Sequence, residues 1–286
     1  MASSLRALRP SVTAQRLGGS ALAPVELGQL LRAMASLQRP LLAFRLPIES
    51  IGSSTAGLLR AARRRQAAAA LILDFADVPA RALAPTLAAV GAAADEAGFG
   101  LPLLLAAEVA PLSFGDAERA AALVGEVLDA GFPTPVISMD GPAELALADD
   151  LLAASAPARE HGLGWALALG SDPGDDLVPL LESLAARGAA PAAVRSSGWV
   201  AGATPRDPGG SRVWLVGNGH ELPEQREQAA QAGVALVQIS LEELRSARGE
   251  RAEAFAYFAA DAALSTWDVE QTGPRAEAAL LAAWTE

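Results

Sequence analysis

Short apolar segments of strand length recur along the chain, and longer stretches rich in alanine and leucine with helical spacing separate most of them. Strands that are apolar nearly throughout are typical of a parallel sheet buried on both faces. Eight such strands alternating with helices predict a closed (β/α)8 barrel, the TIM barrel fold, with an open doubly wound sheet as the alternative. The eight segments are residues 41–46, 70–75, 101–109, 135–140, 165–170, 191–197, 213–217 and 235–240.

The segments between and beyond these strands complete the predicted barrel. Residues 197–211 are rich in glycine and proline and predict a loop. A helix over 24–38 is expected to close the bottom of the barrel, and helices are expected after the last strand over 241–264 and 274–285. The last of these is apolar on most faces, which suits packing against the barrel or a second subunit. The helices between strands, several of which end in glycine, are predicted over 86–98, 115–131, 175–188 and 224–233.

A chain of 286 residues can form one large α/β domain without a second one. We assign residues 24–286 to the barrel with its C-terminal helices, and residues 1–23 to a flexible N-terminal segment. Because this segment is basic and free of acidic residues, an organelle transit peptide is an alternative to an irregular bacterial N-terminus. No apolar run has the length of a membrane span or a secretory signal, so we expect a cytoplasmic protein.

Charge and composition exclude several classes of function. The net charge of −11 opposes binding to nucleic acid and to anionic membranes. The absence of cysteine excludes disulfides, thiolate zinc sites and cysteine nucleophiles. All 22 basic residues are arginine, and an arginine cannot act as an amine nucleophile near neutral pH. Schiff-base catalysis, the metal-free route to aldol chemistry, is therefore closed to this chain.

Polar side chains collect where the predicted strands end, on the face where such barrels carry their active sites. Low dielectric around Glu108 would raise its pKa towards the range useful for proton transfer, unless Arg45 or Arg195 lies close enough to lower it. The two arginines together would bind a carboxylate or a phosphate. The alternative is a set of ion pairs that caps the barrel. The strand-end residues are Arg45, Asp74, Glu108, Asp140, Ser171, Arg195, Asn218, His220 and Ser240.

Three stretches of the chain carry a resemblance to a known family. Ala43 and Phe44 stand where that family has AFNV in its first strand, and LPLLLAAEVA with the later AGFPTPVISMDG follows its VPVALHLDHG and GFTSVMIDGS. Residues 213–240 follow its LVLHGGSGLP, helix and GVAKVNIDTDL. From the first strand to the eighth, the chain resembles the class II, metal-dependent fructose- and tagatose-bisphosphate aldolases, including their tagatose accessory-subunit branch.

The metal site of that family is not reproduced. The resemblance implies histidine ligands from the third, sixth and seventh strands, yet Val109 and Gly217 occupy two of those positions, and no histidine lies between His161 and His220. Alanines replace the glutamates of the fifth-strand motif, at positions 166 and 168. We therefore expect neither a metal nor another cofactor. Zinc-dependent aldol cleavage would require ligands from unexpected positions.

Other positions correspond to the family's site in altered form. The resemblance places Glu108 at its proton-transferring aspartate and Asp140 at the aspartate of GFTSVMIDGS, which makes these two the candidate catalytic residues. Arg45 replaces the asparagine of AFNV. Glu221 would oppose a phosphate in the glycine-rich loop, where backbone N–H groups could still bind one. The candidate substrate-binding residues are Arg45, Asp74, Arg195, Gly217, Asn218, Gly219, His220 and Ser240.

Two functions follow from this pattern. The first is a barrel that has lost catalysis and serves as a ligand-binding, scaffolding or assembly subunit. Such a subunit would form a homo-oligomer or bind a catalytic partner. The second is a metal-independent lyase or isomerase acting on a small anionic sugar phosphate or keto acid. In the second, Glu108 is the general acid or base, and Arg45 and Arg195 hold the substrate and its enolate-like transition state. We favour the first.

Overall fold

The fold is taken from a computed structural model of the chain. It describes residues 2–75, 79–112, 115–139, 141–170, 174–196, 211–217, 234–241 and 249–285.

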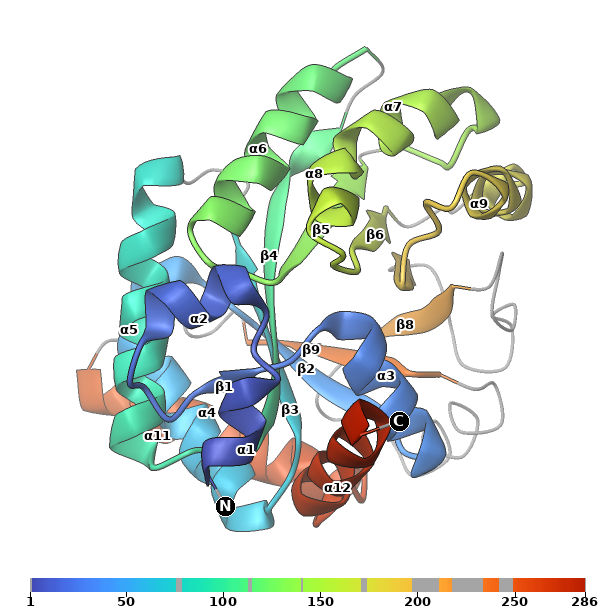
Figure 1. Cartoon of the computed structure of the whole chain (residues 1–286). Coiled ribbons are helices and arrows are strands. Elements are labelled where there is room, and N and C mark those ends of the chain that lie inside the picture. Colours follow the sequence, from blue (N-terminus) through green and yellow to red (C-terminus); the bar gives the residue numbers. More distant parts are fainter. Residues whose placement is uncertain are drawn as a thin grey trace.

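Eight parallel strands form a closed barrel, which confirms the predicted (β/α)8 fold (Figure 1). Each strand pairs with its sequence neighbour, and the last returns to pair with the first, with Leu41 opposite Leu236. A two-residue strand, β1 (Ala23–Pro24), adds to the start of β4. The barrel strands are β2 (Leu41–Leu46), β3 (Ala69–Asp74), β4 (Pro102–Leu112), β5 (Thr134–Met139), β6 (Ala166–Leu169), β7 (Ala193–Ser196), β8 (Arg212–Gly217) and β9 (Leu236–Ser240).

Helices cover the outside of the barrel (Figure 1). The helices predicted over 86–98, 115–131 and 175–188 are confirmed as α5, α6 and α9, whereas the helix over 224–233 and nearly all of the 197–211 loop lie outside the described residues. Outer helices are α4 (Ile51–Arg65), α5 (Leu83–Ala97), α6 (Ala117–Asp129), α7 (Ala148–Ala154), α8 (Ala156–Glu160), α9 (Leu177–Ala186) and α11 (Gly249–Thr266). Short 3-10 turns are η1 (Ile48–Ser50), η2 (Ala80–Ala82) and η3 (Leu145–Leu147).

Strand alternation divides the core into two parts, because successive side chains of a strand point to opposite faces. The larger part lies between the strands and the outer helices. The smaller part fills the barrel interior with alanines, larger aliphatic residues such as Ile72 and Leu104, and Trp214. Helix α3 (Leu27–Ser36) closes the bottom of this interior, as predicted, with Leu27, Leu30, Leu31 and Met34 buried against it.

Residues 2–23, which precede the barrel, include two short helices, α1 (Ala2–Ala7) and α2 (Ser11–Leu17). Leu5 and Leu17 are buried, and the Arg9 guanidinium donates hydrogen bonds to the carbonyls of Gly18 and Ser20. The boundary at residue 23 and the flexibility expected before it stay predictions.

The two C-terminal helices pack on different parts of the barrel (Figure 1). Helix α11 lies along α4, and their backbones come so close that a β-carbon on Gly57 would overlap the Glu253 carbonyl. Arg65 at the end of α4 donates to Asp261 of α11 at 2.7 and 2.8 Å. Helix α12 (Thr272–Thr285) packs on α3. In the described part of the chain, no helix is both long and apolar enough to cross a membrane.

Candidate functional site at the barrel mouth

Four of the predicted strand-end residues, Arg45, Asp74, Glu108 and Arg195, point into the barrel because each follows an interior residue by two positions. Arg45 follows Ala43, and Glu108 follows Ala106, both of which belong to the interior cluster. The register then places Asp74 opposite Glu108 and Arg45 opposite Ser240 in neighbouring strands. The described polar side chains at this end of the barrel are Arg45, Asp74, Glu108, Ser138, Arg195, Gln238 and Ser240.

Glu108 and Arg195 form a two-point ion pair across the barrel interior. The two guanidinium NH groups of Arg195 donate to the two carboxylate oxygens of Glu108, at 2.9 and 2.5 Å. The Glu108 side chain is only 6% exposed and the Arg195 side chain only 10%. Paired, charge-assisted hydrogen bonds of this kind are shorter and stronger than hydrogen bonds between neutral groups. Both oxygens of Glu108 are therefore already engaged with a cation.

A second ion pair lies above the first, nearer to solvent. Arg45 donates to the Asp74 carboxylate at 2.6 Å, and each of these side chains is 26% exposed. The Arg45 Nε is also 3.5 Å from a carboxylate oxygen of Glu108, which links the two pairs. The four groups carry two positive and two negative charges, so the cluster is neutral. A ligand that enters from solvent meets Arg45 and Asp74 before it meets Glu108.

Two residues of this cluster were missed by the sequence analysis. The Gln238 side-chain oxygen accepts a hydrogen bond from Arg195 at 2.9 Å, and the Arg195 guanidinium stacks over the Trp214 ring at 5.1 Å. Gln238 could have been found, because it lies two residues before Ser240 and must share its face of the strand. Trp214 is an apolar strand residue, and nothing in its local pattern distinguishes it from ordinary core. Both residues hold Arg195 in place.

The pKa of Glu108 is lowered, not raised. Burial by itself would raise it, but the hydrogen bonds from Arg195 and the charges of Arg195 and Arg45 outweigh burial and lower the pKa below its ordinary value of 4.5. The sequence left open whether burial would raise this pKa or nearby arginines would lower it. In the structure, the effect of the arginines is the larger one. At neutral pH this carboxyl group is ionised and has no proton to donate.

The lowered pKa predicts an acid-sensitive contribution to stability. A group whose pKa is lower in the folded state binds fewer protons there, so its stabilisation is present above about pH 4.5 and is lost as the pH falls through the folded-state pKa. We expect the free energy of unfolding of the wild type to decline below that pH more steeply than that of a Glu108→Leu/Arg195→Met variant. Urea titrations between about pH 6 and about pH 3 measure this difference. Parallel pH profiles would contradict it.

The remaining predicted site residues divide into two groups. Ser240 accepts a hydrogen bond from the Gln238 amide at 3.3 Å, and Gly217 pairs with Ile239 in the barrel sheet. His161, which is not one of the predicted site residues, follows the last residue of α8, and its Nδ1 lies 2.9 Å from the Pro157 carbonyl oxygen. The others lie outside the described residues: Asp140, Ser171, Asn218, Gly219 and His220.

Among the described residues, the donors at this mouth do not fit the metal that the aldolase resemblance implies. Val109, at a histidine position of that family, is buried in the core outside the strands. The carboxylates of Asp74 and Glu108 are both paired with arginines, whose charges oppose a cation. In the ranges that the structure describes, no three histidine, aspartate or glutamate side chains lie close enough to hold a metal ion.

Comparison with known proteins gives matches in structure only. No protein-family model matches the chain, and no curated protein sequence is detectably similar. The fold is similar to that of the YdjI aldolase from Escherichia coli K12, with a TM-score of 0.65 and 10% identity over 87% of this chain and 99% of that one. The fructose-bisphosphate aldolase from Campylobacter jejuni gives a TM-score of 0.59 and 12% identity over 87% and 96%. A protein of Coccidioides immitis assigned as a fructose-1,6-bisphosphate aldolase gives a TM-score of 0.61 and 14% identity over 87% of this chain and 96% of that one. Identities this low establish a common TIM barrel fold and nothing about the reaction.

Proposed function

We propose that this chain is a class II aldolase-like barrel that has lost its metal site and serves as a ligand-binding or assembly subunit without catalysis. The observation that carries this proposal is the buried two-point ion pair between Glu108 and Arg195. It occupies both the acid–base candidate and one of the two arginines that would hold a substrate. An enzyme that used Glu108 would first have to free this carboxylate from Arg195.

The protonation state of Glu108 also supports the proposal. General acid–base catalysis is most effective when the pKa of the group lies near the working pH, which enzymes commonly achieve by burying a carboxyl group away from cations. Here two arginines lower the pKa of the buried carboxyl. The carboxylate would be a weak base at neutral pH, and each of its oxygens already accepts a hydrogen bond from Arg195. The pair is suited to fixing strands β4 and β7 relative to each other.

The more exposed pair supports a ligand-binding role for the same mouth. Arg45 is a quarter exposed, and its partner Asp74 is equally exposed. A small anion, such as a sugar phosphate or a keto acid, could compete with Asp74 for the Arg45 guanidinium without disturbing the pair beneath. As a subunit, the barrel would act as a homo-oligomer or beside a catalytic partner.

A metal-independent lyase or isomerase is the second candidate function. It is favoured by the 3.5 Å separation between Arg45 Nε and Glu108, since an anionic substrate that draws one arginine away would weaken the hold on the carboxylate. In that case Glu108 would gain basicity only while substrate is bound. The two candidates differ in one observable, the chemical conversion of a bound ligand.

We expect the intact chain to bind an anionic sugar phosphate or keto acid without converting it. A thermal-shift screen finds the ligand, because a ligand that binds only the folded state raises the melting temperature. Arg45→Gln should abolish the shift, whereas Arg119→Gln, the same charge change on the exposed face of α6, should leave it intact. Proton NMR of the mixture then follows the ligand over time. Conversion that Glu108→Gln abolishes would establish the second candidate and refute the first.

A further inference from the structure

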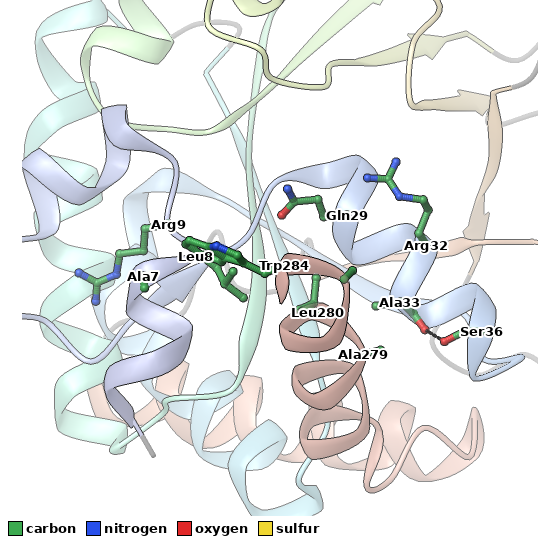
Figure 2. Close-up of a pocket in the computed structure, with 11 residues that line it drawn as sticks. Ala7, Leu8, Arg9, Gln29, Arg32, Ala33, Ser36, Ala279, Leu280 and Trp284 are labelled. Atoms are coloured by element: carbon green, nitrogen blue, oxygen red, sulfur yellow. Dashed lines mark hydrogen bonds between the residues drawn. The ribbon is translucent and has the colours of Figure 1, made fainter. Parts of the chain in front are cut away.

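A pocket of about 650 Å³ lies at the end of the barrel opposite the mouth, in the size range of small-molecule sites (Figure 2). Its walls come from α1 with the residues that follow it, from α3 and from α12. Helix α3 separates the pocket from the barrel interior, because one side of this helix is buried in the interior cluster and the other side lines the pocket. Nothing in the mouth cluster contributes to it.

One wall of the pocket is apolar and includes an exposed indole. Leu8 and Leu280 line it, and Trp284, which is 54% exposed, lies beside Leu8 in Figure 2. An exposed tryptophan at the edge of a concave apolar surface is the kind of side chain against which a planar ring stacks. This wall favours a ligand with a flat, apolar body.

The polar side of the pocket is cationic. Gln29 and Arg32 lie three positions apart on α3 and therefore on the same face of the helix. In the described part of the chain, no hydrogen bond or ion pair engages the Arg32 guanidinium. Among the described residues that line the pocket, two are arginines and none is acidic. The lining of this pocket is therefore positively charged, although the chain as a whole has a net charge of −11.

Arg9 adds to the positive potential from a buried position. Its NH groups donate to the carbonyls of Gly18 and Ser20, but its Nε is buried and has no hydrogen-bond acceptor among the described residues. Burial and the nearby charge of Arg6 lower the pKa of Arg9, since both disfavour its charged form. An anion in the pocket would reduce this cost.

We propose that this pocket binds a small aromatic carboxylate, with its ring against Trp284 and Leu8 and its carboxylate on Arg32. A guanidinium holds a carboxylate through two parallel hydrogen bonds, which a neutral group of the same size cannot reproduce. The Gln29 amide, which comes from the same face of α3, would donate a further hydrogen bond to the ligand. The proposal concerns a different end of the barrel from the mouth and does not depend on the function proposed there.

Calorimetric titration of the full chain tests this proposal with three acids, benzoate, 2-naphthoate and indole-3-acetate, and with 2-naphthalenemethanol as a neutral analogue. We expect saturable binding of at least one acid to a single site, and weaker binding of the neutral analogue. Arg32→Gln should weaken binding of that acid about tenfold or more, as expected for the loss of a charge-assisted hydrogen bond. Trp284→Ala should also weaken it, because the ring loses its apolar partner.

The control variant is Arg119→Gln, an exposed arginine on α6. It should bind the acid as tightly as the wild type, since it removes the same charge far from the pocket. The proposal is overturned if none of the three acids binds saturably, if the neutral analogue binds as tightly as the acid, or if Arg32→Gln has no greater effect than Arg119→Gln. Failure of these titrations would not affect the function proposed for the mouth, because that function is tested separately with the Arg45→Gln variant.

Discussion

Replacement of Glu108 by leucine is expected to lower the free energy of unfolding by about 3–5 kcal/mol, because it leaves the buried Arg195 guanidinium without its partner carboxylate. Gln238 and the Trp214 ring remain beside Arg195, but neither carries a negative charge to neutralise it. Urea unfolding at neutral pH, followed by circular dichroism, measures the change.

The double variant Glu108→Leu/Arg195→Met is the decisive comparison. Removal of both partners of a buried ion pair is commonly neutral or stabilising, because it also removes the cost of burying two charges. The double variant should therefore recover most of the stability lost in Glu108→Leu. The surface pair between Arg187 and Asp149, whose side chains are 38% and 85% exposed, provides the control, and Arg187→Met should change the unfolding midpoint little. If Glu108→Leu were as stable as the wild type, the ion pair would not be the structural element described above.

Gly57→Ala is expected to lower the free energy of unfolding by about 1–3 kcal/mol or more, through steric overlap in the α4–α11 contact. A β-carbon at this position would overlap the Glu253 carbonyl oxygen and lie 2.9 Å from the carbonyl carbon and 3.1 Å from the Tyr257 nitrogen. All these atoms belong to the backbone of α11, which cannot yield as the end of a side chain can. The two helices would have to separate, and the Arg65 pair with Asp261 would be strained with them. Denaturant unfolding measures the loss.

The same helix supplies a matched control. Gly52 also lies in α4, and a β-carbon there meets no atom within 4 Å. Because alanine favours a helix over glycine by roughly 0.5–1 kcal/mol, Gly52→Ala should be neutral or slightly stabilising. Equal effects of the two substitutions would show that helix propensity, and not the close approach of α4 to α11, decides the outcome.

The barrel could be predicted from the sequence because its strands are buried on both faces and therefore stand out as short apolar runs. The run 41–46 and the strand Leu41–Leu46 coincide, and the run 70–75 differs from Ala69–Asp74 by one residue. The convergence of Arg45, Asp74, Glu108, Arg195 and Ser240 at one end followed from the same pattern, since parallel strands bring their ends together.

The pairing within that cluster could not be predicted in the same way. Glu108 and Arg195 are 87 residues apart and lie on β4 and β7, which do not neighbour each other in the sheet. Whether a strand-end arginine faces a carboxylate or an open ligand site depends on the barrel's radius and tilt, which periodicity does not encode. Trp214 was missed for a related reason, because its role depends on the guanidinium stacked above it.

The most direct test of the proposal that this mouth holds no divalent metal is the zinc content of the intact chain after equilibrium dialysis against a zinc-containing buffer. We expect no more bound zinc than in a sample of the Glu108→Leu/Arg195→Met variant, because the described carboxylates at the mouth, Asp74 and Glu108, are paired with arginines. One zinc ion bound per wild-type chain, and lost in that variant, would contradict the account.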